Sequence, residues 1–183
     1  MARSGMKRVT IHSDGACEGN PGPGGWAAVL QHGSHRREIS GGVPATTNNR
    51  MEQQAAIEAL RALKEPCEIE FFTDSEYLRE GITSWIHAWR LNRWRTTERK
   101  PVKNADLWQQ LDEQAGRHQA RWNWLKGHAG HAENERCDFL ANQEIARLRK
   151  QFTSEHLAAA LAEFTNQVNE PRQQMLFQPP PAP

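Results

Sequence analysis

The order of strand-like and helix-like segments constrains the fold of this chain more than any other sequence feature. Short apolar or alternating patterns predict strands at residues 8–13, 26–31, 36–42, 67–73 and 120–126. Helical spacing predicts helices at residues 49–64, 105–116 and 133–150, and another that begins after Asp74 and Ser75. The order of three strands, helix, strand, helices, strand and helix is typical of an α/β fold. Its sheet is expected to begin as an antiparallel meander and to continue through crossover helices.

The length and composition indicate one folded domain followed by an extension. A chain of 183 residues is long enough to bury a core. Its 25% charged and 37% apolar residues are ordinary for a globular protein. Beyond Lys150, helical spacing predicts a short amphipathic helix over residues 154–169, and frequent prolines predict a flexible tail from residue 171. We therefore place one domain at residues 1–150 and a C-terminal extension at residues 151–183.

The chain carries no pattern typical of a membrane protein or of an oxidising compartment. Its first residues lack the apolar region of a signal peptide, and no stretch approaches the roughly 18 apolar residues of a membrane span. The cysteines, Cys17, Cys67 and Cys137, are odd in number and form no CxxC pair. We expect a monomeric, cytoplasmic protein with reduced cysteines.

Positive charge is concentrated in one segment, although the formal net charge is only +1. Residues 85–103 contain a single acidic residue, Glu98, and six basic residues: Arg90, Arg93, Arg95, Arg99, Lys100 and Lys103. A local basic block inside a near-neutral protein indicates contact with a nucleic acid better than the total charge does.

Four carboxylates occupy positions that are unusual for acidic residues. Asp14 and Asp74 each end a predicted strand, where the ligand sites of α/β sheets gather. Glu52 and Asp138 are in phase with the apolar residues of predicted helices, so both are expected to face the core, where an unpaired carboxylate is costly. Any one of them alone could be a helix cap, a surface charge or half of an ion pair. Together they are the oxygen ligands that suit Mg²⁺ or Mn²⁺.

Four segments of the chain resemble, in order, the motifs of bacterial type I ribonuclease H. They are residues 13–25 (SDGACEGNPGPGG), 46–52 (TTNNRME), 73–75 (TDS) and 126–138 (KGHAGHAENERCD). The resemblance covers about residues 6–150. It implies the ribonuclease H-like fold, in which helices flank a five-stranded mixed sheet. It also implies an endonuclease that cuts the RNA strand of RNA–DNA hybrids and leaves 5′-phosphate and 3′-hydroxyl ends.

The resemblance assigns catalytic roles to five residues. Asp14, Glu52, Asp74 and Asp138 match the carboxylates that hold two Mg²⁺ ions during catalysis, and Mn²⁺ is expected to substitute. His128 matches a histidine on a flexible loop, where a neutral imidazole passes protons or assists product release near pH 7.

The resemblance also implies which residues bind the hybrid. Contacts to both strands across the minor groove are expected from four residues: Cys17 (through its backbone), Asn20, Asn48 and Asn49. Asn48 and Asn49 could also cap the following helix, and the two roles are compatible. Thr47 and Asn104 match positions that grip a phosphate of the DNA strand.

Two positions depart from the family pattern. Ala45 stands where the family often has an arginine, which weakens the expected phosphate pocket. Glu76 stands where bacterial relatives commonly have glutamine, and its charge puts the contact expected there in doubt.

Residues 81–103 resemble the basic handle of the family. Its arginines Arg90, Arg93 and Arg95 are expected to contact phosphates. Its tryptophans and Trp108 could stack on bases, but aromatic residues more often pack into cores and stiffen such projections. Trp85 is the exception, because it matches a position that packs on the sugars of the DNA strand.

The C-terminal tail contains one further motif. Residues Gln173–Phe177 resemble the short peptides with which bacterial replication proteins bind the sliding clamp, although Gln174 replaces the usual leucine. The alternatives are that this segment packs against the enzyme itself or that the motif only reflects the composition of the tail.

Two other functions remain open for the whole chain. They are a catalytically weak hybrid-binding module and another nuclease of the same superfold.

Overall fold

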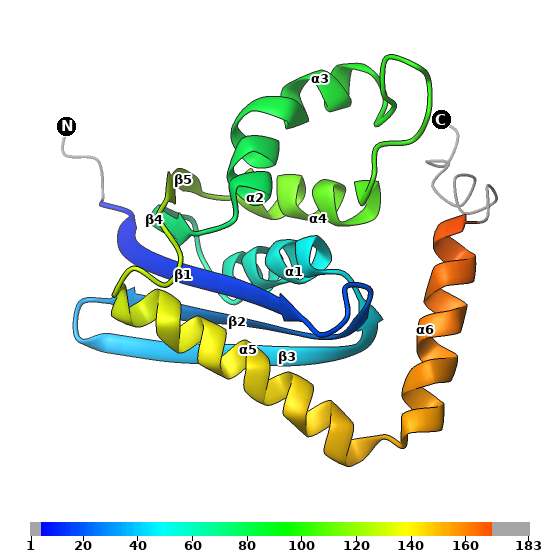
Figure 1. Ribbon diagram of the computed structural model, residues 1–183. Helices are drawn as coiled ribbons and strands as arrows, with labels where there is room; N and C mark the ends of the chain where they lie inside the picture. The colour runs from blue at the N-terminus through cyan, green and yellow to red at the C-terminus, as the bar shows by residue number, and fades with distance from the viewer. Residues whose placement is uncertain (1–4, 170–183) are drawn as a thin grey trace.

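The computed structural model describes residues 5–169 and contains one five-stranded sheet in the order β3-β2-β1-β4-β5 (Figure 1). The strands β1 (Lys7–Cys17), β2 (Gly22–His32) and β3 (His35–Thr46) form an antiparallel meander. The strands β4 (Cys67–Thr73) and β5 (Gln119–Trp124) are parallel to β1. The mixed sheet expected from the order of segments is therefore confirmed.

Helices cover both faces of this sheet. The helix α1 (Asn48–Arg61) packs on one face together with α4 (Ala105–Ala115), and α5 (Ala132–Gln151) lies across the other face, in front of β1–β3 in Figure 1. Between β4 and α4 the chain forms α2 (Glu76–Glu80), a π-helical turn (Gly81–Trp85) and α3 (Ile86–Leu91). The helix that starts after Ser75 therefore changes its winding at Gly81 and continues to Leu91.

The alternation of side chains along β2 divides the core between the two faces. Ala28 belongs to the larger apolar cluster, which includes Ile57 of α1 and Trp108 of α4. Its neighbours Ala27 and Val29 point to the opposite face and pack against Cys137 and Ala141 of α5. Successive strand residues face opposite sides, so one strand supplies both cores.

The strand predicted at residues 26–31 begins four residues earlier, because the glycine-rich residues 22–25 form the start of β2. Gly25 pairs with Ala16 of β1. A Cβ atom at this position would lie 2.0 Å from the carbonyl oxygen of Ala141. The glycine is needed here because the backbone of α5 approaches the sheet directly. It marks a close helix–strand contact within a continuous strand.

The start of α1 is one residue earlier than predicted, and its end is three residues earlier. Thr47 is the N-cap and its hydroxyl accepts a hydrogen bond from the backbone N–H of Arg50 at 3.4 Å. The capping role considered for Asn48 and Asn49 therefore belongs to Thr47. At the other end, the N–H of Leu63 turns to the carbonyl of Leu60, which closes the last turn before Lys64.

The segment predicted as the handle projects from α2 and returns to α4, at the top of Figure 1. A β-bridge between Arg95 and Pro101 closes its loop. Trp108 is fully buried, and Trp89 and Trp94 pack partly buried against the main core. These three tryptophans are therefore packing residues, whereas Trp85 remains 40% exposed.

The last helix, α6 (Ser154–Asn169), stands beside the ends of β2 and β3 in Figure 1 and contacts both strands. It spans the range in which the sequence predicts a helix, and Leu157 is buried at its start. The proposed clamp-binding segment Gln173–Phe177 lies outside the described residues. Within residues 5–169, no helix combines the length and apolar character needed to cross a membrane.

Candidate active site

Three of the four suspected carboxylates meet at one edge of the sheet. His12 of β1 pairs with Phe72 of β4, so Asp14 and Asp74 each lie two residues further along neighbouring parallel strands. Glu52 reaches the same point from α1. One oxygen from each carboxylate lies within 4.8 Å of the others. Asp14 is 6% exposed and Glu52 is 3% exposed, so the inward direction expected for Glu52 is confirmed.

This crowding makes negative charge costly. Burial, and then the charge of Asp74, raise the pKa of Asp14 to about 7. Burial, followed by the charges of Asp14 and Asp74, holds the pKa of Glu52 well above its usual value. Burial also raises the pKa of Asp74. Desolvation and mutual repulsion both favour the neutral carboxyl group.

The same cluster fits a divalent cation. The buried oxygen Oε2 of Glu52 has no hydrogen-bond partner among the described residues. Asp14, in contrast, accepts a hydrogen bond from the N–H of Gly15 at 2.9 Å. An unpaired buried oxygen beside two other carboxylates is the donor set of a hard cation such as Mg²⁺ or Mn²⁺. Asp14, Glu52 and Asp74 could therefore hold such an ion.

Asp138 lies next to this cluster, outside its compact set of oxygens. Its charge raises the pKa of both Asp14 and Asp74, and its Oδ1 accepts a hydrogen bond from Asn142 at 3.0 Å. The expectation that Asp138 faces the core is wrong, because it is only half-buried. The buried stripe of α5 that contacts β2 includes Cys137 and Ala141. Asp138 follows Cys137 and is rotated by about 100° around the helix, so it lies at the border of this stripe.

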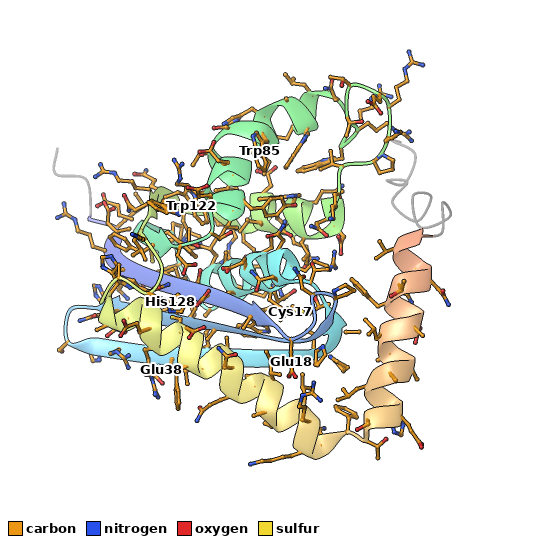
Figure 2. All side chains as sticks on the ribbon, in the orientation of Figure 1. Cys17, Glu18, Glu38, Trp85, Trp122 and His128 are labelled. Atoms are coloured by element: carbon orange, nitrogen blue, oxygen red, sulfur yellow. The ribbon has the colours of Figure 1, made fainter. Side chains whose placement is uncertain are left out.

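His128 lies in the loop before α5 (Figure 2). Its charge lowers the pKa of the Asp74 carboxyl group. It has a left-handed backbone with φ of 53°. A Cβ atom on the preceding Gly127 would lie 2.5 Å from Oδ2 of Asp74. The loop therefore passes close to this carboxylate at Gly127, and a side chain at this position would press against Asp74.

Sequence reasoning missed two groups that hold Asp74. The side chain of Asn134 is buried in α5 and hydrogen-bonds to the Asp74 carboxylate. The indole Nε1 of Trp124 donates to the backbone carbonyl of Asp74 at 2.9 Å. Asn134 lies on the inward face of α5 with Cys137, and a polar residue there was the available signal, because a buried amide requires a partner.

The residues expected to contact the minor groove come together at the start of α1. The Oδ1 of Asn20 accepts a hydrogen bond from the backbone N–H of Asn48 at 2.9 Å, which joins the β1–β2 turn to the helix that carries Asn49. Cys17 ends β1 next to this turn (Figure 2), and its thiol contacts the carbonyl oxygen of Thr46. These side chains form one continuous part of the structure.

The two residues expected to grip a DNA phosphate are linked through Arg50. Thr47 caps the helix at the N–H of Arg50, and the Arg50 guanidinium donates to Oδ1 of Asn104 at 3.3 Å. Asn104 has a left-handed backbone with φ of 59°. The same guanidinium forms two hydrogen bonds with Asp106. Asp106 therefore neutralises the charge of the Arg50 guanidinium.

The handle arginines differ in their surroundings. Arg90 forms an ion pair with Asp112 through two hydrogen bonds. Arg95 donates to the carbonyl oxygen of Arg99 at 3.0 Å. Within residues 5–169, neither Arg93 nor Arg95 forms an ion pair with an acidic side chain. The net positive charge of this surface is therefore carried by Arg93 and Arg95 more than by Arg90. Glu76 is exposed in the first turn of α2.

A mixed sheet with a buried acidic cluster at the ends of parallel strands defines an α/β protein with a candidate metal centre. A family model described as RNase H matches residues 6–146, and the chain belongs to this family. A Ribonuclease H from Chelativorans sp. (strain BNC1) is 60% identical over 145 residues, which cover 79% of this chain and 90% of that protein. A Ribonuclease H from Nitrobacter hamburgensis is 59% identical and covers 81% and 99% of the two chains.

Solved structures show the same fold. The crystal structure of LC9-RNase H1, described as a type 1 RNase H with the type 2 active-site motif, has a TM-score of 0.72 and 32% identity, and covers 79% of this chain and 75% of that one. LC11-RNase H1 in complex with an RNA/DNA hybrid has a TM-score of 0.58 at 22% identity, and covers 76% and 97% of the two chains. The ribonuclease H-like fold implied by the motifs is therefore confirmed.

Proposed function

We propose that this protein hydrolyses the RNA strand of RNA–DNA hybrids and leaves 5′-phosphate and 3′-hydroxyl ends. The observation that carries the proposal is the convergence of Asp14, Glu52 and Asp74, with a buried oxygen of Glu52 left unpaired. Membership of the RNase H family and relatives named Ribonuclease H support it. The enzyme is proposed to be a monomer in which residues 1–150 form the catalytic domain and residues 151–183 form an extension.

In the proposed reaction the carboxylates bind metal and their neighbours hold them in place. Asp14, Glu52, Asp74 and Asp138 would hold two Mg²⁺ ions, with Mn²⁺ as a substitute. When bound, such ions activate water and stabilise charge on the leaving oxygen. Asn134 and Gly15 orient two of these carboxylates. His128, beside Asp74, is proposed to carry a proton away from the site.

The choice of a hybrid is proposed to depend on contacts to both strands. Asn20, Asn48 and Asn49, with the backbone of Cys17, would reach sugar and base edges in the minor groove, because amides both donate and accept hydrogen bonds. Thr47 and Asn104 would bind a DNA phosphate, and Trp85 would pack on DNA sugars. The hydrogen bond between Asn20 and Asn48 supports a shared surface for the first group.

One assay tests this function against its alternatives. Labelled RNA–DNA, RNA–RNA and DNA–DNA duplexes are incubated with the protein, with and without Mg²⁺. Cleavage of RNA only in the hybrid, and only with metal, is expected. Hybrid binding without cleavage would identify a binding module, and cleavage of another duplex would identify a different nuclease of the same superfold.

The handle should contribute salt-dependent affinity through its unpaired arginines. Arg93→Ala combined with Arg95→Ala is expected to raise KM and to reduce the slope of log affinity against log salt by about two, with little change in kcat. The matched control is Arg90→Ala, which removes an arginine already paired with Asp112 and should change the slope less. KM measured over a salt series checks this. An unchanged slope in the double variant would show that this surface faces away from the substrate.

The tail is proposed to bind a sliding clamp through Gln173–Phe177, which would raise the local concentration of the enzyme near primer RNA. A labelled peptide of residues 168–183 should bind a bacterial clamp. A control peptide carrying Leu176→Ala and Phe177→Ala should not bind. Fluorescence anisotropy measures both, and equal affinities of the two peptides would contradict the proposal.

A further inference from the structure

The hydroxyl of Tyr77 joins two side chains at the base of the handle. Tyr77 lies in α2, three residues after Asp74. Its Oη accepts a hydrogen bond from Nδ2 of Asn104 at 3.1 Å and a second from the indole Nε1 of Trp108 at 3.2 Å. Asn104 and Trp108 lie at the start of α4, so this one oxygen connects α2 to α4.

These contacts determine which way the Asn104 amide points. Its Oδ1 accepts from Arg50, and its Nδ2 donates to Tyr77. A side-chain amide has two N–H donors, so the second N–H remains available for an outside acceptor such as a phosphate oxygen. Asn104 also has a left-handed backbone, which few residues adopt without support from their surroundings. The amide is therefore held on both sides before any ligand arrives.

The ring of Tyr77 also contacts Trp85, a second residue that is expected to touch the DNA strand. The two ring centroids are 5.8 Å apart, and the ring of Trp108 lies 5.3 Å from Tyr77 on another side. Trp108 is fully buried and fixes this aromatic group against the core. Asn104 and Trp85, which are both expected to contact the DNA strand, thus both contact Tyr77.

We propose that Tyr77 is a positioning residue for the DNA strand of the hybrid. By holding one N–H of the Asn104 amide, the Tyr77 hydroxyl keeps the other N–H directed at the phosphate. The hydroxyl oxygen itself does not contact the substrate. This inference rests on the proposed function, because it takes the substrate to be a hybrid whose DNA strand passes Asn104. Substrate affinity should depend on the hydroxyl, whereas the chemistry at the carboxylate cluster should not.

The variant Tyr77→Phe removes the hydroxyl and keeps the ring against Trp85. KM for a hybrid is expected to rise about 3- to 10-fold with kcat unchanged, the usual range for loss of one hydrogen bond. In an Asn104→Ala background, the same substitution should leave KM unchanged, because the amide that it positions is absent. The double-mutant cycle isolates this coupling.

The control Trp108→Phe removes the other hydrogen bond to the same oxygen and keeps an aromatic ring. It is expected to lower the melting temperature and to leave KM within about 2-fold of wild type. Circular dichroism on each variant checks that it is folded at the assay temperature.

The outcomes distinguish a failure of the positioning role from a failure of the proposed function. If wild type cuts hybrids and Tyr77→Phe leaves KM unchanged, or raises it equally in the Asn104→Ala background, the positioning role is overturned while the function stands. If wild type neither binds nor cuts hybrids, the proposed function and the positioning role both fail.

Discussion

Replacing Asp14 with asparagine is expected to reduce hydrolysis of an RNA–DNA hybrid to less than about one tenth of the wild-type rate at saturating Mg²⁺. Asp14 belongs with Glu52 and Asp74 to the only group of three or more acidic side chains whose oxygens converge within residues 5–169. The amide keeps the shape of the side chain but removes one charged ligand. The substitution should therefore act on metal binding and on kcat.

Hybrid binding by the same variant should survive, and it should tighten slightly, because negative charge is removed from a surface that is proposed to face the phosphates of the hybrid. Single-turnover hydrolysis and a filter-binding titration on one hybrid give the two measurements. Loss of both activity and binding would indicate a folding defect. A retained rate above about one tenth of wild type would mean that Asp14 is not a shared metal ligand.

The largest effect on stability is expected from the same carboxylate in the absence of metal. The pKa of Asp14 is about 7 in the folded protein, against an ordinary value of 3.8. Folding therefore favours the protonated form, and this contribution is present at low pH and lost as pH rises from about 4 through 7. Relative to Asp14→Asn, metal-free wild type should lose about 4 kcal/mol of unfolding free energy across this window.

Urea unfolding of wild type and Asp14→Asn in EDTA, at several pH values between 4 and 8, measures this difference directly. The variant should be the more stable protein at pH 8, and the two curves should converge near pH 4. Added Mg²⁺ should raise the stability of wild type more than that of the variant, because a ligand of the folded state stabilises it. Parallel curves across the whole pH range would contradict the repulsion that we infer.

Much of the site could be predicted from local sequence patterns. The predicted strand endings brought Asp14 and Asp74 together correctly, because β1 and β4 are neighbouring parallel strands. Only Asp74 lies at the end of its strand, since β1 continues past Asp14 to Cys17. Helical phase placed Glu52 in the interior. The same method failed for Asp138, since a residue at the border of an apolar stripe differs from one at its centre by a rotation that spacing alone does not resolve.

The remaining contacts depend on residues that are distant in the chain. Arg90 meets Asp112, and Tyr77 receives hydrogen bonds from Asn104 and Trp108, only after the handle has folded against α4. The basic block could be recognised by composition, but composition does not show which arginine is neutralised. Nor does a glycine-rich run reveal that Gly25 serves a close helix–strand approach.

The last turn of α5 determines how far the chain must extend to keep one ion pair of the catalytic domain. Arg149 lies beyond residue 146, where the family match stops, and binds both carboxylate oxygens of Glu18 at 2.6 and 2.7 Å. Glu18 adjoins the turn that carries Asn20. The counter-charge for an acid at the edge of the turn that is proposed to face the hybrid thus comes from the far end of the domain. A chain shortened to residue 146 would expose that acid to phosphate, whereas one shortened after Lys150 would keep it masked.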